Sequence, residues 1–584
     1  MLTLARRTIT GDAEALDATL HPVLRRVYAA RGIRTMAELA QALDGLLPIG
    51  TLSGVGAAAE LLCAHRENRV TVVGDFDADG ATSTALVLRA LRSWGFADAD
   101  HLVPNRFEFG YGLTPEIVQV AIARGSRLIM TVDNGVASNA GVAAARAAGI
   151  DVLVTDHHLA GEALPAANVI VNPNLPGSDF GSRALAGVGV AFYVMASLRR
   201  LLDSAGLLPP GAPPVTQWLD LVALGTVADV VPLDRNNRVL VAQGVARIRA
   251  GRCVPGISAL LAVANRDAAQ IVAGDLGFTV GPRINAAGRL SDMSLGIRCL
   301  LSDDPSEART LAEELNALNQ KRREIEADMQ TQALAAVRSL RTGAQQASTA
   351  ETPVAGRGET RSGVVLFDPG WHQGVVGLVA SRIKEQLRRP VIAFAPADGE
   401  QLRGSARSVA GVHVRDVLAS IDARHPGLMG RFGGHAMAAG LSLEMRHLDQ
   451  FAREFDAEVA RWLAVHGSPD VIETDGELEE REIALPTAVS LRGGGPWGSA
   501  FPEPLFDGMF EIRSSRVVGE RHLKLQVSAP EGRGVFEAIA FNCIDPAAPR
   551  PAPVGRQRLA YRLGTNEYRG DLRLQLVVEH WLPA

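Results

Sequence analysis

The pattern of apolar and polar positions alternates between two periods along the first half of the chain. Short runs rich in valine, isoleucine and leucine predict buried strands, and alanine-rich segments between them predict helices. The predicted strands are residues 69–74, 127–132 and 151–155, and the predicted helices are residues 85–91 and 141–148. Strands that alternate with helices at this spacing indicate a parallel sheet with helices on both faces. The expected fold class is therefore α/β.

The second half of the chain begins with one long helical pattern. Residues 305–340 place apolar side chains at helical spacing and would span roughly 50 Å as a single helix. Such a helix either packs within a domain or connects two lobes across a cleft, and both interpretations stay open. Residues 343–362 are rich in Gly, Ala, Ser and Thr, which predicts a flexible loop.

Two further folded regions follow, and the chain start is helical in pattern. A strand at 363–367 and a helix at 375–387 predict a second α/β unit. Residues 522–527 and 572–577 alternate apolar and polar positions, which predicts an antiparallel barrel or sandwich of OB-fold size. Residues 1–50 are expected to be helical.

Length and composition limit the classes of protein. A chain of 584 residues is too long for one core, so we expect three or more domains. With 47% hydrophobic and 21% charged residues, the sequence is typical of a folded protein rather than a disordered one. We expect neither a signal peptide nor a membrane span, because no apolar run is long enough. The four cysteines lie far apart without a Cys-x-x-Cys pair, which argues against a zinc ribbon or disulfides and predicts a cytoplasmic location.

Acidic residues follow the predicted strands. Asp75, Asp77 and Asp79 come directly after the first strand, Asp133 after the second, and the run Asp156-His157-His158 after the third, while Asp229 follows a helical run. The carboxyl ends of parallel strands gather at one edge of a sheet, so we expect these side chains to meet there. The net charge of −5 disfavours nucleic-acid binding only weakly, because carboxylates that hold metal ions also count toward it.

Several carboxylates at one place require a cation, because they would otherwise repel one another and take up protons. Carboxylate oxygens with one or two imidazoles suit Mn²⁺ or Mg²⁺. Six or seven ligands predict two ions about 3.5–4 Å apart, an arrangement that hydrolyses phosphodiesters. An EF-hand calcium loop is excluded, because its twelfth position is Leu86 and a strand precedes it. Helix caps and turns explain any one of these acids, but not the whole set.

The motifs together are similar to those of the DHH phosphoesterase superfamily. The segment 223–229 (ALGTVAD) completes the strand-end motifs, and residues 281–290 (GPRINAAGRL), 404–408 (GSARS) and 431–435 (RFGGH) resemble the RecJ branch. One departure is Phe76, where the superfamily often has tyrosine, although that hydroxyl is no metal ligand. The resemblance implies a metal-dependent exonuclease that degrades single-stranded DNA from its 5′ end, in recombination and repair.

The resemblance also implies a domain organisation. The expected parts are an N-terminal helical segment (1–50), a parallel-sheet DHH catalytic domain (51–304), a connecting helix (305–342), a flexible loop (343–362), a DHH-associated α/β domain (363–467) and a C-terminal β-barrel of the OB-fold type (468–584). Single-strand-binding protein and a helicase are the implied partners. We expect a monomer without membrane contact.

Roles for the acidic cluster are carried over from the resemblance. The implied metal ligands are Asp75, Asp77, Asp79, Asp133, His157 and Asp229, with Asp133 as the bridge between the ions. His158 is implied to face the scissile phosphate and Asp156 to orient a histidine. A purely structural histidine is the alternative for His158.

Further residues are implied to bind the DNA strand. Those in the first domain are Arg106, Arg283, Asn285 and Arg289. Those in the second domain are Ser405, Arg407, Gly433, Gly434 and His435, which we interpret as a pocket for the terminal 5′ phosphate. Any single arginine is by default interpreted as part of a surface salt bridge. Only the surrounding motifs favour contact with phosphate for these arginines.

The C-terminal domain adds further candidates. Its aromatic residues Trp497, Phe501, Phe506 and Phe510 are expected to be mostly core rather than base-stacking. Its basic residues Arg513, Arg516, Arg521 and Lys524 are better candidates for contact with the DNA backbone.

Two other functions fit parts of the sequence. A phosphodiesterase for short oligonucleotides or cyclic dinucleotides, or a pyrophosphatase, uses the same chemistry, but such relatives generally lack a C-terminal barrel. A non-catalytic DNA-binding scaffold would have lost metal ligands, and here each expected position is filled.

Overall fold

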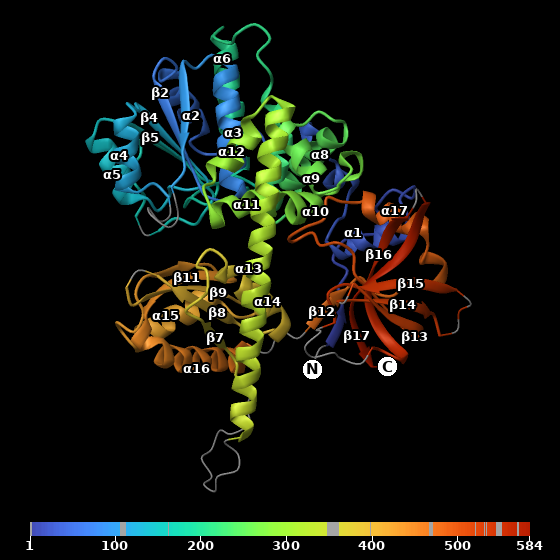
Figure 1. Cartoon of the computed structure of the whole chain (residues 1–584). Helices are drawn as coiled ribbons and strands as arrows, with labels where there is room; N and C mark the ends of the chain where they lie inside the picture. The colour runs from blue at the N-terminus through green and yellow to red at the C-terminus, as the bar shows by residue number, and fades with distance from the viewer. Residues whose placement is uncertain are drawn as a thin grey trace. The chain divides into compact units, whose positions relative to one another are not determined.

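The computed structural model of the chain forms two compact units (Figure 1). One comprises Leu4–Asn316 with Ile472–Ala584, and the other comprises Met1–Thr3 with Ala317–Val471. The structure describes residues 3–104, 112–161, 163–346, 361–397, 399–466, 471–519, 521–530, 532, 534–544, 552–568 and 571–583. Among these residues no single helix is long and apolar enough to cross a membrane, although the bent pair Leu43–Thr51 and Val55–Ala64 meets the same criterion by length and composition.

The first unit is built on a parallel five-stranded sheet. Its strands, in spatial order, are β3 (Asp98–Leu102), β2 (Arg69–Gly74), β4 (Leu128–Val132), β5 (Asp151–Thr155) and β6 (Val169–Val171), and every pairing is parallel. The predicted bounds of β2 and β5 are confirmed, and β4 begins one residue later than predicted. Strands β3 and β6 were not predicted, because β3 is polar and β6 has only 3 residues.

Helices cover both faces of this sheet, as predicted (Figure 1). On one face, α4 (Pro115–Ala123) and α5 (Asn139–Ala147) pack on alternate residues of the strands, among them Val73, Ile129 and Val152. The helices α3 (Ala78–Ser93) and α6 (Gly187–Ser204) contact the strands from the other face. The described part of this domain also contains α2 (Val55–Ala64), α7 (Leu219–Ala228), α8 (Arg235–Arg249), α9 (Pro255–Val263), α10 (Ala273–Asp275), the π-helix η6 (Leu276–Val280), α11 (Gly281–Leu290) and α12 (Ser294–Leu301), together with the 3₁₀ helices η4 (Val215–Trp218) and η5 (Ala268–Gln270).

The long helix α13 runs without interruption over Pro305–Gln346, 42 residues in all. It begins in one compact unit and continues in the other, as the connector interpretation requires. The predicted loop was wrong for residues 343–346, which continue the helix because alanine and glutamine favour it. The rest of that loop, up to residue 360, lies outside the described residues.

The second unit contains the second predicted α/β domain. Its sheet has the order β10 (Phe432–Gly434), β11 (Ala438–Glu444), β9 (Gln401–Arg407), β8 (Val391–Pro396) and β7 (Val364–Phe367). Only β7 and β8 pair in parallel. The helices α14 (Val376–Leu387), α15 (Val414–Arg424) and α16 (Leu448–His466) accompany it, and α15 and α16 supply much of the core.

The C-terminal region of the first unit is a closed barrel, as expected of an OB-fold. Its strands are β13 (Phe506–Val518), β14 (His522–Ser528), β15 (Val535–Ala540), β17 (Asp571–Pro583) and β16 (Gly555–Tyr568), and the parallel pairing of β15 with β17 closes it. The predicted core aromatics are confirmed: Phe501, Phe506 and Phe510 are buried, and Trp497 stacks on Phe501 with 5.1 Å between ring centroids. In the basic set, Arg513, Arg516 and Arg521 are exposed, while Lys524 pairs with Glu537 at 3.0 Å.

The chain start corrects one prediction. Residues 3–6 were expected to be helical, but they form β1 (Thr3–Arg6), which pairs with β12 (Val471–Thr474). A strand of 4 residues takes its hydrogen bonds from a distant partner, so its local pattern cannot reveal it. The helix α1 (Pro22–Ala30) and three short 3₁₀ helices follow: Met36–Leu39, Leu43–Gly45 and Ile49–Thr51.

Candidate metal centre

The segment after β2 carries the first three acids of the cluster. Asp77 is the N-cap of α3, and its Oδ1 accepts the backbone N–H groups of Asp79 and Gly80, both at 3.0 Å. Asp79 points toward the start of α6, where Gly187 donates to one carboxylate oxygen at 2.6 Å and Val188 to the other at 2.9 Å. The positive end of a helix dipole stabilises a carboxylate there. The two helices therefore hold the Asp79 carboxylate in a fixed position.

Asp133 follows β4 in a strained conformation. Its φ of 63° lies in the left-handed region that non-glycine residues seldom adopt. A β-carbon on Gly187 would lie 2.6 Å from the β-carbon of Asp133, so only glycine permits this close approach. The start of α6 thus fixes both Asp79 and Asp133.

The third strand end contributes the acid and the two histidines. Asp156 Oδ1 accepts a hydrogen bond from His158 Nδ1 at 2.8 Å and from the backbone N–H groups of His157 and His158 at 2.7 and 3.1 Å. The other carboxylate oxygen accepts the N–H of Val136 at 2.8 Å. The Asp156 carboxylate therefore binds the backbone and one side chain of this segment, and its implied role of orienting a catalytic histidine stays a prediction.

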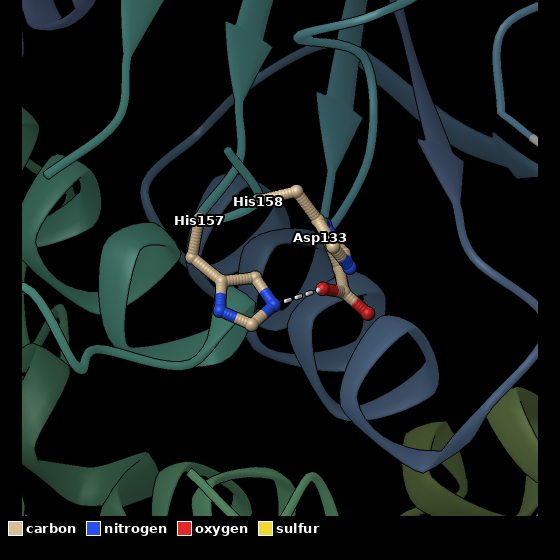
Figure 2. Close-up of side chains that lie close together, drawn as sticks. All are labelled: Asp133, His157 and His158. Carbon is tan, nitrogen blue, oxygen red and sulfur yellow. Dashed lines mark ion pairs between the residues drawn. The ribbon is translucent and has the colours of Figure 1, made fainter. Parts of the chain in front are cut away.

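The side chains from the three strand ends and from α7 converge at one place. His157 Nε2 lies 3.1 Å from Asp133 Oδ1 (Figure 2) and 3.6 Å from Oδ2 of Asp229, the residue that ends α7. Three groups can each bring their ligand atoms within 4.8 Å of one another: Asp133, His157 and His158; Asp79, His157 and Asp229; and Asp75, Asp77 and Asp133. The groups overlap at Asp133 and His157, which suits two neighbouring ions better than one.

The electrostatics of the cluster fit a cation. Burial, and next the charge of Asp77, raise the pKa of Asp79 to about 7. Burial and neighbouring carboxylates also raise the pKa values of Asp133 and Asp229 well above the ordinary value. These acids favour protons unless a cation neutralises them.

The two histidines differ in charge. Burial, followed by the charge of His158, lowers the pKa of His157 to about 4, so its ring is neutral and can act as a ligand. Among the described residues, His157 Nε2 has no hydrogen-bond partner. Burial opposes the protonation of His158, but the hydrogen bond to Asp156, together with the charges of Asp156, Asp229 and Asp75, outweighs burial and raises the pKa to about 9.

The DNA contacts that were predicted in the first unit, as far as the structure describes them, all lie on α11. Asn285 on α11 accepts the N–H of Ala78 at 2.7 Å, so it holds the metal-binding segment directly. Arg283 donates to the carbonyl of Thr279 at 2.5 Å and to Asn316 at 3.0 Å, and Arg289 is partly exposed in the last turn of α11. Arg106 lies outside the described residues.

The predicted phosphate pocket lies within the second unit and its residues are neighbours. Arg407 donates to the Ser405 hydroxyl at 2.8 Å, and both side chains approach Gly377 in the first turn of α14. In the sheet, Gly433 pairs with Gly440, which in turn pairs with Ser405. His435, which follows β10, donates its N–H to the Ala438 carbonyl at 2.7 Å.

Sequence reasoning missed several supporting residues. The Asn134 amide donates to the carbonyls of Val73 and Val132 at 3.0 and 2.9 Å, which ties the ends of β2 and β4 together. Asn172 and Asn174 donate to the backbone carbonyls of His158 and His157. A small residue at a helix start is the only sequence signal for Gly187. Asn134 lies in the motif that begins at Asp133 but had no role assigned to it, and Asn172 and Asn174 give no signal beyond their type.

Comparisons with known proteins identify the family. Family models match three parts of the chain: DHH family, N-terminal domain (69–226), DHHA1 domain (361–461) and RecJ OB domain (474–580). A single-stranded-DNA-specific exonuclease RecJ from Dickeya dadantii is 53% identical over 588 residues, covering 100% of both chains. The chain belongs to the RecJ family.

Solved RecJ structures resemble this chain along almost its whole length. The RecJ of Thermus thermophilus in complex with Mn²⁺ has 31% sequence identity and a TM-score of 0.77, covering 97% of this chain and 76% of that one. The same protein in complex with Mg²⁺ has 30% identity and a TM-score of 0.71, covering 96% and 74%. The succession of DHH domain, DHHA1 domain and OB barrel is therefore that of a RecJ.

Proposed function

We propose that this RecJ family chain is a metal-dependent exonuclease that degrades single-stranded DNA from its 5′ end and releases 5′ mononucleotides, in recombination and repair. The observation that carries the proposal is the overlap of three ligand groups at Asp133 and His157 in a chain of this family. The C-terminal barrel favours a polymeric substrate over a cyclic dinucleotide.

The ligands proposed for two Mn²⁺ or Mg²⁺ ions are Asp75, Asp77, Asp79, Asp133, His157 and Asp229. When bound, such ions lower the pKa of water and neutralise charge on the scissile phosphate. The chain itself fixes the carboxylates by the contacts of Asp79 with α6 and of Asp77 with α3. Relatives with Mn²⁺ and with Mg²⁺ support either ion for this chain.

His158 is the proposed contact to the reacting phosphate. Its side chain is 35% exposed, against 12% for His157, so its ring can reach a substrate. Asp156 holds His158 Nδ1, so the other ring nitrogen is the one proposed to face the phosphate, where a protonated imidazole donates a hydrogen bond to developing negative charge. Asp156 is thus a positioning residue.

The direction of digestion is assigned to the second unit. Ser405 and Arg407 lie beside the first turn of α14, where the positive end of the helix dipole favours an anion. Gly433, Gly434 and His435 lie on the same sheet or directly after it. Such a pocket holds a terminal 5′ phosphate better than an internal diester, because the terminal group carries more negative charge. The proposed contacts to the internal phosphates of the DNA strand are Arg106, Arg283 and Arg289, together with Asn285.

Cellular context follows from the same proposal. Single-strand-binding protein and a helicase are the proposed partners, and the chain is proposed to act as a cytoplasmic monomer. The proposed domain limits are 51–304 for the catalytic domain, 363–467 for the DHH-associated domain and 468–584 for the barrel. The connecting helix between the first two is α13, which ends at Gln346 rather than at the predicted residue 342.

A comparison of substrates tests the proposal. Purified protein is given a 5′-phosphorylated single strand or a cyclic dinucleotide, each with Mn²⁺, with Mg²⁺ or with a chelator. We expect nucleotide release from the strand with either metal and none with the chelator. Turnover of the cyclic dinucleotide alone would favour the phosphodiesterase alternative instead.

A further inference from the structure

In the domain that contains the candidate metal centre, the side chain of Phe278 is exposed to solvent. Phe278 is 90% exposed, although Leu276 and Val280 in the same π-helix, η6, are both fully buried. Burying a phenylalanine side chain stabilises a fold, so the exposure of this ring to solvent forgoes that stabilisation. Short π-helices occur often at functional sites.

The π-helix lies against the end of α7, directly before the metal ligand Asp229. A β-carbon on Gly277 would lie 3.0 Å from Val227 Cγ1, and one on Gly281 would lie 3.1 Å from the β-carbon of Ala228. The backbone on either side of Phe278 therefore contacts the two residues that precede Asp229 by one and two positions. The exposed ring projects from a segment adjoining the metal centre.

Neighbouring contacts hold this segment in place. Arg283 donates to the carbonyl of Thr279 and to Asn316, which ties η6 to α11 and to the start of α13. Gly277 and Gly281 permit the close packing on α7. The ring is thus carried by a fixed support rather than by a free loop.

A second exposed apolar side chain lies next to Asp229. Val230 is 68% exposed and has a φ of 61°, in the left-handed region that β-branched residues rarely adopt. Strain of this kind persists where the surrounding structure holds it, and it gathers at binding sites. Two exposed apolar residues therefore border a polar metal centre.

We infer that Phe278 is a stacking platform for one base of a single-stranded DNA substrate near its reacting end, with Val230 as an apolar contact beside it. The inference rests on the proposed function. Every base offers a flat π-face, so stacking binds a single strand without selecting its sequence. A base held in a duplex is stacked on its neighbours, so the same platform favours unpaired substrate.

Affinity measured on strands with one missing base tests this platform. Binding of 5′-phosphorylated strands is measured with a chelator present, each strand carrying one abasic position in the first six nucleotides. We compare the unchanged chain, Phe278→Ala, Phe278→Trp and the control Val465→Ala, which removes an apolar side chain that is 78% exposed in α16.

We expect that the loss of DNA affinity caused by the abasic position and the loss caused by Phe278→Ala do not add. For the unchanged chain and the control, one abasic position should weaken binding by roughly 5- to 150-fold, the equivalent of about 1–3 kcal/mol for a stacked base. Phe278→Ala should bind the intact strand weakly by a similar factor and lose nothing further at that position, and Phe278→Trp should restore the affinity.

The inference would be overturned if the affinity lost through Phe278→Ala and the affinity lost through an abasic position were independent of each other. If Phe278→Ala bound intact DNA normally, or if the abasic losses were the same in both proteins, the ring would not stack on a base. A ring that docks a protein partner predicts that outcome. Failure of the proposed function is separate, because it would show as absent cleavage by the unchanged chain with Mn²⁺ and Mg²⁺.

Discussion

Asp133, like His157, belongs to two of the three overlapping ligand groups, and it is the carboxylate that the groups share. Its backbone is strained, its carboxylate lies 3.1 Å from His157 Nε2, and burial raises its pKa in the absence of a cation. None of these features stabilises the fold by itself. They are the features of a side chain placed for a ligand.

Replacing Asp133 with alanine should lower the kcat for single-stranded DNA by roughly a thousand-fold or more, because a metal site supplies several kcal/mol of charge stabilisation. DNA binding should stay measurable, since other contacts carry it. Steady-state digestion and filter binding check both, with Asp44→Ala, an exposed carboxylate, as the control. Near-normal turnover of the Asp133 variant would contradict the two-metal account.

Gly187→Ala tests the same centre without removing any ligand. The new β-carbon would meet Asp133 at 2.6 Å, so either α6 or Asp133 must shift. We expect an activity loss of about a hundred-fold and a destabilisation of about 1–3 kcal/mol. Gly56→Ala in α2 is the matched control, because nothing lies within 4 Å of the added atom. Equal behaviour of the two variants in activity and thermal unfolding would refute the proposed role of Gly187.

At the scale of elements, the local pattern determined how much could be predicted. The strands β2 and β5 are rich in valine and buried at every position after the first, so their bounds were predictable. The polar strand β3, the short β6, and β1, which depends on a distant β12, carry too little local pattern. The convergence of the strand-end acids was predictable because parallel strands share a carboxyl edge.

The contacts that support the site could not be predicted in the same way. Gly187 donates to Asp79 across more than a hundred positions of sequence, and Asn285 holds Ala78 across more than two hundred. Asn285 was predicted from its motif as a DNA contact, and the structure adds its hydrogen bond to the metal-binding segment. Such pairs depend on how the helices pack on the sheet, and the local periodicity of apolar residues gives no information about that packing.

The prediction about the direction of digestion concerns Arg407, which lies on strand β9 beside the first turn of α14. Arg407→Ala should weaken the use of 5′-phosphorylated strands more than that of 5′-hydroxyl strands, by roughly ten-fold or more, because a lost charge-assisted contact is worth about 1.5–3 kcal/mol. The measurement is steady-state digestion of strands that differ only in that phosphate. Arg403→Ala, an exposed arginine on the same strand, is the control. An equal loss on both strands would place Arg407 at an internal phosphate.

At the scale of the whole molecule, the order of domains matches a processing enzyme for polymeric DNA. The chain combines a DHH domain, a DHHA1 domain and an OB barrel, and its motifs include none that resembles a helicase motor. We therefore expect digestion to need an unpaired 5′ end.

Blunt duplex should accordingly be a poor substrate. With equal lengths and sequences, the initial rate on blunt duplex should be at least about ten-fold below that on the single strand, because unpairing each step costs about 1.4 kcal/mol. A duplex with a 5′ overhang should be digested down to the junction. Similar rates on all three substrates would contradict single-strand specificity.

The central claim is that this chain, which would hold metal ions at Asp133 and His157, removes nucleotides from the 5′ end of a single strand. One time course tests it most directly: a single strand labelled at its 5′ end, or at its 3′ end, incubated with Mn²⁺, with Mg²⁺ or with a chelator. The account predicts that the 5′ label appears at once as a mononucleotide, that the 3′ label passes through shortening intermediates, and that the chelator stops both. Early release of the 3′ label, or digestion unchanged by the chelator, would contradict it.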